Sequence, residues 1–132
     1  MNILKKDSFH YFIVDTGADI SLLKKDCIRS DILCNPRDRI KIQGINKDCI
    51  ETLASTHSKI FFPNIKTVDH KFHIVGDNFN LNCSGILGID FLQNFKSIVD
   101  YDSGILELNL GDSRIFIDLC SSPDDIIKNN AT

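Results

Sequence analysis

The sequence has few of the features that mark a stapled, membrane-bound or nucleic-acid-binding protein. It has five cysteines among 132 residues, an odd number at irregular spacing with no CxxC pair. This argues against a disulfide framework and a structural zinc site. No apolar run approaches the roughly 20 residues of a membrane-spanning helix, and residues 1–7 lack the apolar core of a signal peptide. A net charge of −3 does not point to nucleic acid. We therefore expect a reduced, intracellular protein with no metal, cofactor, nucleic-acid or membrane partner.

The length of the chain suits a single domain. We expect this domain to span residues 1–119, followed by a loose polar tail at 120–132. Short runs of β-branched and aromatic residues, separated by turn residues, favour an all-β, mostly antiparallel fold. The runs expected to be strands are residues 9–15, 39–43, 50–62, 66–75, 97–101, 105–110 and 115–119. Apolar residues at helical spacing predict one short helix at 89–95.

The motif with the clearest chemistry is Asp15-Thr16-Gly17-Ala18-Asp19, directly after an apolar run. It places a carboxylate at the exit of a strand, in a turn that Gly17 can bend. One such carboxylate could bind an ion or cap a helix, and the motif alone is equally consistent with a plain strand-to-turn connection. Two carboxylates face to face could share a proton and activate a water. The chain has one DTG motif, so this chemistry would require two copies of the chain.

A second segment changes the weight of the first. Gly85-Ile86-Leu87-Gly88-Ile89-Asp90-Phe91-Leu92 combines an apolar strand, a glycine and the start of the predicted helix. Together the two segments resemble the retroviral-type aspartic proteases, or retropepsins, and are most similar to those of Ty3/gypsy-like LTR retrotransposons. The resemblance covers roughly residues 9–119. It implies a retropepsin-like closed barrel, the half of an acid protease, that works as a homodimer on polypeptide substrates.

The resemblance also implies roles for individual residues. Asp15 would be the catalytic aspartate, Thr16 would lock the two loops together across the dimer, and Gly17 would let the backbone approach the substrate. The hairpin at about 40–52 would be the flap that closes over the substrate. The residues implied to contact substrate are Ala18, Asp19, Ile20, Leu22, Ile42, Gly44, Ile45 and Ile86. Asp90 resembles a buried position that hydrogen-bonds back toward Ser21, a structural role.

The chain departs from the retroviral pattern in two places. Ile89 stands where retroviral members commonly carry an arginine that pairs with the residue matching Asp19. Few residues precede Asp15, and we expect the strand that usually interleaves with the partner to be truncated or absent. We therefore expect the C-terminal hairpin, about 103–119, to supply most of the dimer interface.

The function implied by the resemblance is an aspartic endopeptidase that processes a Gag–Pol-type polyprotein, in the cytoplasm or within virus-like particles. The alternative is a catalytically silent, domesticated retropepsin-like module that dimerises and binds peptides without cutting them. A metal site is disfavoured. His70 and His73 are three residues apart in a predicted strand, which points them to opposite faces, and we interpret them as packing or surface residues.

Overall fold

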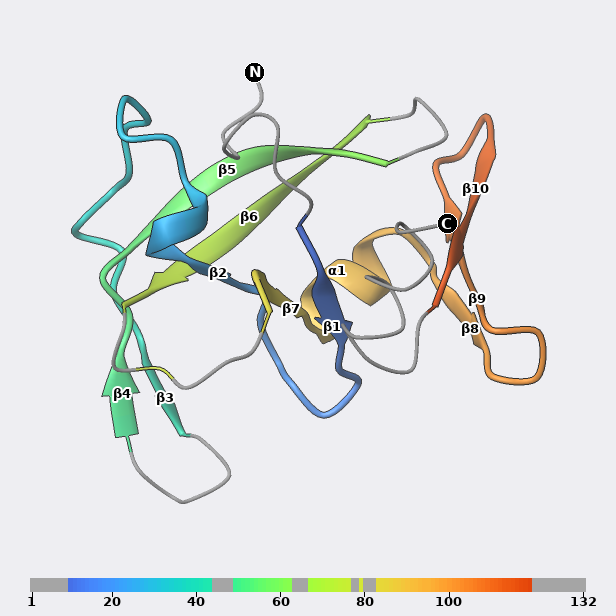
Figure 1. Ribbon diagram of the computed structural model, residues 1–132, viewed down its shortest axis with the longest axis horizontal. Helices are drawn as coiled ribbons and strands as arrows, with labels where there is room; N and C mark the ends of the chain where they lie inside the picture. The colour runs from blue at the N-terminus through green and yellow to red at the C-terminus, as the bar shows by residue number, and fades with distance from the viewer. Residues whose placement is uncertain (1–9, 44–48, 63–66, 77–78, 80–82, 120–132) are drawn as a thin grey trace, which may run out of the picture.

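The computed structural model describes residues 10–43, 49–62, 67–76, 79 and 83–119 (Figure 1). The described chain is mostly strand with one short α-helix, which confirms the all-β class and the helix predicted near 89–95. The elements in chain order are β1 (Phe12–Val14), β2 (Leu22–Lys24), the 3-10 helix η1 (Lys25–Cys27), β3 (Lys41–Gln43), β4 (Cys49–Glu51), β5 (Ala54–Phe61), β6 (Thr67–Val75), β7 (Gly85–Leu87), α1 (Ile89–Asn94), β8 (Ile98–Asp100), β9 (Ile105–Asn109) and β10 (Arg114–Asp118).

The largest sheet has five strands in the order β1-β7-β2-β6-β5. Strand β7 lies between β1 and β2, parallel to β1 and antiparallel to β2. Since β1 and β2 flank the loop that carries Asp15, the inserted strand β7 holds both ends of that loop (Figure 1).

The expected barrel closure is not found in the part of the chain that the structure describes. Strands β1 and β5 are the two edges of the five-stranded sheet, which is open. The pairs β1–β7 and β2–β6 are parallel, and the other described strand pairs are antiparallel.

The extended stretch predicted over 50–62 is two strands, β4 and β5, rather than one. Strand β4 pairs with β3, whereas β5 pairs with β6 along its whole length. The chain changes partner at Thr52, which is buried. There Thr52 N donates to Ile40 O at 2.8 Å, and Ile40 N donates to Thr52 Oγ1 at 3.0 Å. These bonds satisfy the backbone where the ladder is interrupted. The hairpin tip at 44–48 lies outside the described residues.

The C-terminal strands form a separate three-stranded antiparallel sheet in the order β10-β9-β8. Gly104 and Gly111, in the turns between these strands, have φ of 68° and 90°, a region that favours glycine. Strands β9 and β10 send Leu106, Leu108 and Ile115 into the main core.

The main core lies between the five-stranded sheet, α1 and the C-terminal sheet (Figure 1). Its largest fully buried side chains include Phe72 of β6, Phe91 of α1 and Leu23 of β2. Among the described residues, no helix has the length and apolar character required to cross a membrane.

Candidate active site

Asp15 follows the last residue of β1, and its position is determined by backbone hydrogen bonds. Asp15 N donates to Leu87 O of β7 at 3.0 Å, which continues the β1–β7 ladder past the end of the strand. Ala18 N donates to Asp15 O at 3.2 Å, and Gly17 N donates to Asp15 Oδ1 at 2.9 Å. The aspartate therefore closes a tight turn around itself. Asp15 is half-buried, and Thr16 and Gly17 are exposed.

The segment that joins β7 to α1 lies directly against this loop. Ile89 N donates to Ala18 O at 2.7 Å. Between Leu87 and Ile89, a Cβ on Gly88 would lie 2.4 Å from Ile20 O and 2.8 Å from Ala18 O. Both clashes involve backbone atoms, so only glycine allows this approach. The glycine of the second sequence segment is thus explained by its contact with the first.

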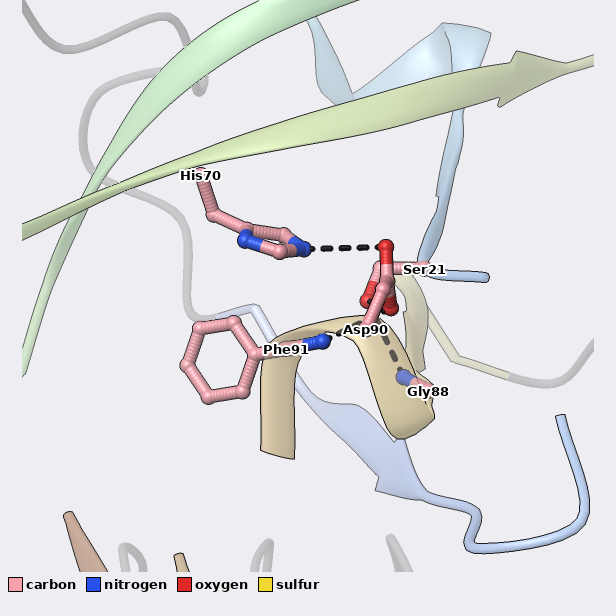
Figure 2. A network of polar contacts seen from close by, with 5 residues as sticks. All are labelled: Ser21, His70, Gly88, Asp90 and Phe91. Carbon is pink, nitrogen blue, oxygen red and sulfur yellow. Dashed lines mark hydrogen bonds and ion pairs between the residues drawn. The ribbon is translucent and has the colours of Figure 1, made fainter. Parts of the chain in front are cut away.

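A buried polar network continues from Gly88 into the protein (Figure 2). Gly88 N donates to Ser21 Oγ at 3.0 Å, and Ser21 Oγ donates to Asp90 Oδ1 at 2.7 Å. The hydrogen bond expected between Asp90 and Ser21 is therefore present. The second carboxylate oxygen of Asp90 is 3.1 Å from Nε2 of His70. Sequence reasoning missed this link, because nothing in the sequence connects His70 to the start of α1.

The apolar residues implied to contact substrate lie together on the sheet. Leu22, Val75 and Ile86 form a buried cluster. The partly buried residues packed against it are Ala18, Ile20, Ile42 and Phe79. The structure thus brings together five of the predicted substrate residues, Ala18, Ile20, Leu22, Ile42 and Ile86, and adds Val75 and Phe79. No signal in the sequence pointed to Val75, because its place in the cluster depends on the parallel pairing of β6 with β2.

Among the remaining predicted residues, Asp19 is described and is not part of that cluster. Asp19 is exposed. Gly44 and Ile45 lie outside the described residues. Ile42 reaches the cluster from β3, where it pairs with Ile50 of β4 in the hairpin predicted to be the flap.

The structure also describes the two histidines of β6 and four of the cysteines. His70 and His73 are both buried, so neither is a surface residue. Cys27, Cys34, Cys49 and Cys83 are free thiols, and burial raises the pKa of Cys83. Within the described ranges, no group of three or more histidines, cysteines or acidic residues is placed to hold a metal ion.

Comparison with solved structures places the fold among retroviral protease-like domains. The structure matches the crystal structure of the retroviral protease-like domain of Ddi1 from Leishmania major with a TM-score of 0.65. That match covers 94% of this chain and 98% of the other at 15% sequence identity.

The sequence itself identifies the family. Residues 3–99 match the family model of the retroviral aspartyl protease, and the chain belongs to this family. Over 95 residues it is 39% identical to the retrovirus-related Pol polyprotein from transposon 412 of Drosophila melanogaster. The aligned region is 67% of this chain and 7% of that polyprotein, so the chain corresponds to a small part of its relative.

Proposed function

We propose that the chain is one half of a homodimeric aspartic endopeptidase. The observation that carries this proposal is the loop around Asp15, in which a half-buried carboxylate is held by Leu87 and Gly17 in a chain of the retroviral aspartyl protease family. One chain contributes one such loop. A two-fold axis between two copies would place two Asp15 carboxylates side by side.

The chemistry then follows from the pair. Two adjacent carboxylates cannot both ionise easily, so one keeps a proton. The ionised carboxylate takes a proton from a bound water, which attacks the peptide carbonyl carbon. The protonated carboxylate donates to the carbonyl oxygen as the carbon becomes tetrahedral. No covalent intermediate with the protein forms, and no metal or cofactor takes part.

The surroundings of the loop fit a polypeptide substrate. In this proposal Thr16 joins the two loops across the axis, and Gly17 and Asp19 face the substrate backbone. In this proposal Ala18, Ile20 and Ile42, which are partly buried and pack against Leu22, Val75 and Ile86, line apolar subsites, which favour apolar residues beside the cleaved bond. The hairpin β3–β4 acts as the flap. The likeness to a transposon Pol polyprotein supports a Gag–Pol-type polyprotein as substrate, cut in the cytoplasm or in virus-like particles.

Replacement of Asp15 by asparagine tests the proposal. Asn keeps the oxygen that accepts from Gly17 N, so the loop and the fold are retained. We expect peptide cleavage at mildly acidic pH to fall by about a thousandfold or more, because the general acid and base are removed together. A statine-type transition-state analogue should inhibit the wild type. The matched control is Asp112→Asn, an exposed carboxylate in the β9–β10 turn, which should cleave like the wild type.

Two outcomes separate the proposal from its rival. A wild-type dimer that binds peptides and the analogue without cutting would establish the silent module. Cleavage by Asp15→Asn at the wild-type rate would rule out Asp15 as the catalytic group.

A further inference from the structure

His70 is the member of the polar network at the end away from the Asp15 loop, and its ring is fixed in place. Only 8% of its surface is exposed. The edges or faces of Phe72 and Phe91 meet the ring at nearly right angles, with centroids 5.3 and 5.1 Å away. Its Nε2 lies 3.1 Å from Asp90 Oδ2. A carboxylate only accepts hydrogen bonds, so the imidazole carries a proton on Nε2 and donates it to Asp90.

The direction of every other bond in the network is then set. Asp90 Oδ1 accepts from Ser21 Oγ at 2.7 Å and from Phe91 N at 2.8 Å. Because Ser21 uses its only proton on Asp90, its oxygen is free to accept from Gly88 N at 3.0 Å. His70 therefore determines which way the Asp90 carboxylate faces, and Asp90 determines the orientation of the Ser21 hydroxyl (Figure 2).

The network ends at the two residues that hold the Asp15 loop. Leu87 and Ile89 flank Gly88 in the chain, so their positions follow that of Gly88. Leu87 O accepts from Asp15 N at 3.0 Å, and Ile89 N donates to Ala18 O at 2.7 Å. A shift of Gly88 would therefore move the backbone on both sides of Asp15.

We infer that His70 is a positioning residue for Asp15, acting through Asp90, Ser21 and Gly88. The inference rests on the proposed function, since the geometry of Asp15 matters most if that carboxylate does chemistry. His70 does not touch the reacting atoms. Its effect is on the precision of the loop, and misplacement of a reacting group by about 1 Å can cost on the order of a hundredfold in rate.

The fold should survive loss of this donor. The Asp90 side chain is 32% exposed, so water can replace the histidine at Oδ2. A carboxylate bonded to water instead of a rigid ring is free to rotate, and its hold on Ser21 loosens. Loss of the His70 donor should therefore loosen the Asp15 loop without unfolding the chain.

The test uses replacements that separate the hydrogen bond from the packing. His70→Phe and His70→Leu both remove the donor, one with an aromatic and one with an aliphatic side chain. His70→Gln keeps an N–H donor at a position close to that of Nε2. The control is Phe95→Leu, which removes a ring packed against His70 with a centroid distance of 6.2 Å and leaves the hydrogen bonds in place.

The first measurement is kinetic, on the full-length dimer at saturating and limiting peptide. We expect His70→Phe and His70→Leu to lower kcat by about tenfold to a hundredfold with KM little changed. His70→Gln should stay within about threefold of the wild type, and Phe95→Leu should lose stability without this loss of kcat. Wild-type kcat in folded His70→Phe or His70→Leu would overturn the inference, as would a loss in His70→Gln equal to theirs.

The second measurement does not depend on activity. Hydrogen exchange of the Asp15 and Ile89 amides, which bond to Leu87 O and Ala18 O, should become about tenfold faster in the variants without the donor. It should be unchanged in His70→Gln and Phe95→Leu. If the wild type does not cleave peptides, the proposed function fails, but the exchange rates still decide the role of His70. Unchanged exchange at both amides would overturn it.

Discussion

The Asp15 loop and the outer face of the C-terminal sheet differ in how far a single chain completes them. The loop is completed by its own chain, since Asp15 N and Ala18 O both have partners in the segment from Leu87 to Ile89. The outer face of the sheet carries exposed apolar side chains. Ile98 of β8 and Phe116 of β10 are 57% and 53% exposed.

These two exposed side chains form one row. Both pair with Glu107 of the central strand β9, so they lie on the same face of the sheet. Tyr101, at the end of β8, is 82% exposed. Glu107 lies between Ile98 and Phe116 in this row, and exposed apolar side chains on either side of it offer contact area. If the proposed homodimer forms, this comparison predicts that the geometry of the carboxylate is set within one chain, whereas the C-terminal sheet provides contact area for the second copy.

The largest effect should come from Gly88→Ala, which disrupts the contact between the β7–α1 segment and the Asp15 loop. Alanine there would place its Cβ 2.4 Å from Ile20 O. Because the obstacle is backbone, the β7–α1 segment must move away from the Asp15 loop. We expect Gly88→Ala to lower the free energy of unfolding by about 3 kcal/mol. Peptide cleavage should fall further than the loss of folded protein explains. Urea unfolding and peptidase assays on the same samples measure both.

Gly111→Ala is the matched control in the second region. Gly111 has a φ of 90°, but a Cβ added there would meet no atom within 4 Å. Alanine there costs about 1 kcal/mol for the left-handed backbone alone, and cleavage per folded molecule should be unchanged. Equal losses of stability and activity in the two variants would show that the Asp15 loop is no more tightly held than the β9–β10 turn.

A smaller effect should come from replacing the exposed apolar side chains on the outer face of the C-terminal sheet with polar ones. We expect the double variant Ile98→Asn and Phe116→Asn to raise the dimer dissociation constant by about tenfold to a hundredfold, because two apolar side chains lose their contact with the partner. Sedimentation equilibrium measures the change. The control is Phe61→Asn on β5, which is 54% exposed and should leave the dimer unchanged.

Deletion of the C-terminal hairpin would not make the same test. Strands β9 and β10 supply Leu106, Leu108 and Ile115 to the core, so a chain ending at Tyr101 would lose stability as well as surface. If the double variant Ile98→Asn and Phe116→Asn dimerises as tightly as Phe61→Asn, the dimer interface lies elsewhere, and the C-terminal sheet does not provide the contact area.

The local structure was largely predictable from the sequence, whereas the pairing between distant strands was not. Runs of β-branched and aromatic residues located most of the strands, but not β2 or the break between β4 and β5. The spacing of Ile89, Leu92 and Phe95 located α1. Alternation does not say which strands become neighbours. The parallel pairing of β2 with β6 joins segments far apart in the chain, so the contribution of Val75 to the apolar cluster could not be derived.

The burial of both His70 and His73 was unpredictable for the same reason, because alternation does not show which strands become neighbours. A strand covered on one face should expose either His70 or His73, yet both are 8% exposed. The first half of β6 alternates between exposed and buried residues, but Phe72 to Val75 are all buried. There β6 pairs with β2 and β5, and its side chains enter two different apolar clusters, Phe72 and Ile74 the main core and Val75 the cluster with Leu22. The residues of the loop were predictable because their motif is local. The link from His70 to that loop depends on packing that the motif does not contain.

The smallest effect concerns pH. It separates the five-stranded sheet, which contains His73 and carries the Asp15 loop, from the C-terminal sheet. Burial lowers the pKa of His73 below its ordinary value of 6.5, and Lys71 adds to the effect, while Asp38 and Asp90 oppose it. His73 therefore binds a proton less readily in the folded chain than in the unfolded chain. The contribution of His73 to the free energy of unfolding is fully present above pH 6.5 and is lost as the pH drops below that value. Urea unfolding of the wild type from about pH 7.5 to about pH 5 should show this fall, and His73→Gln should reduce it.

The nearby acid group does not act in this range. Hydrogen bonds from Lys71 and Ser55 hold the pKa of Asp38 below its ordinary value of 3.8, so its contribution is lost only in more acidic solution. Strands β8 to β10 contain no histidine, so dimer affinity should change less than monomer stability over the same pH range. If stability instead rose on acidification, His73 would be charged in the fold and paired with Asp38. If the wild type and His73→Gln declined in parallel, the sensitivity would belong to another group, and the contrast between the two regions would not extend to pH.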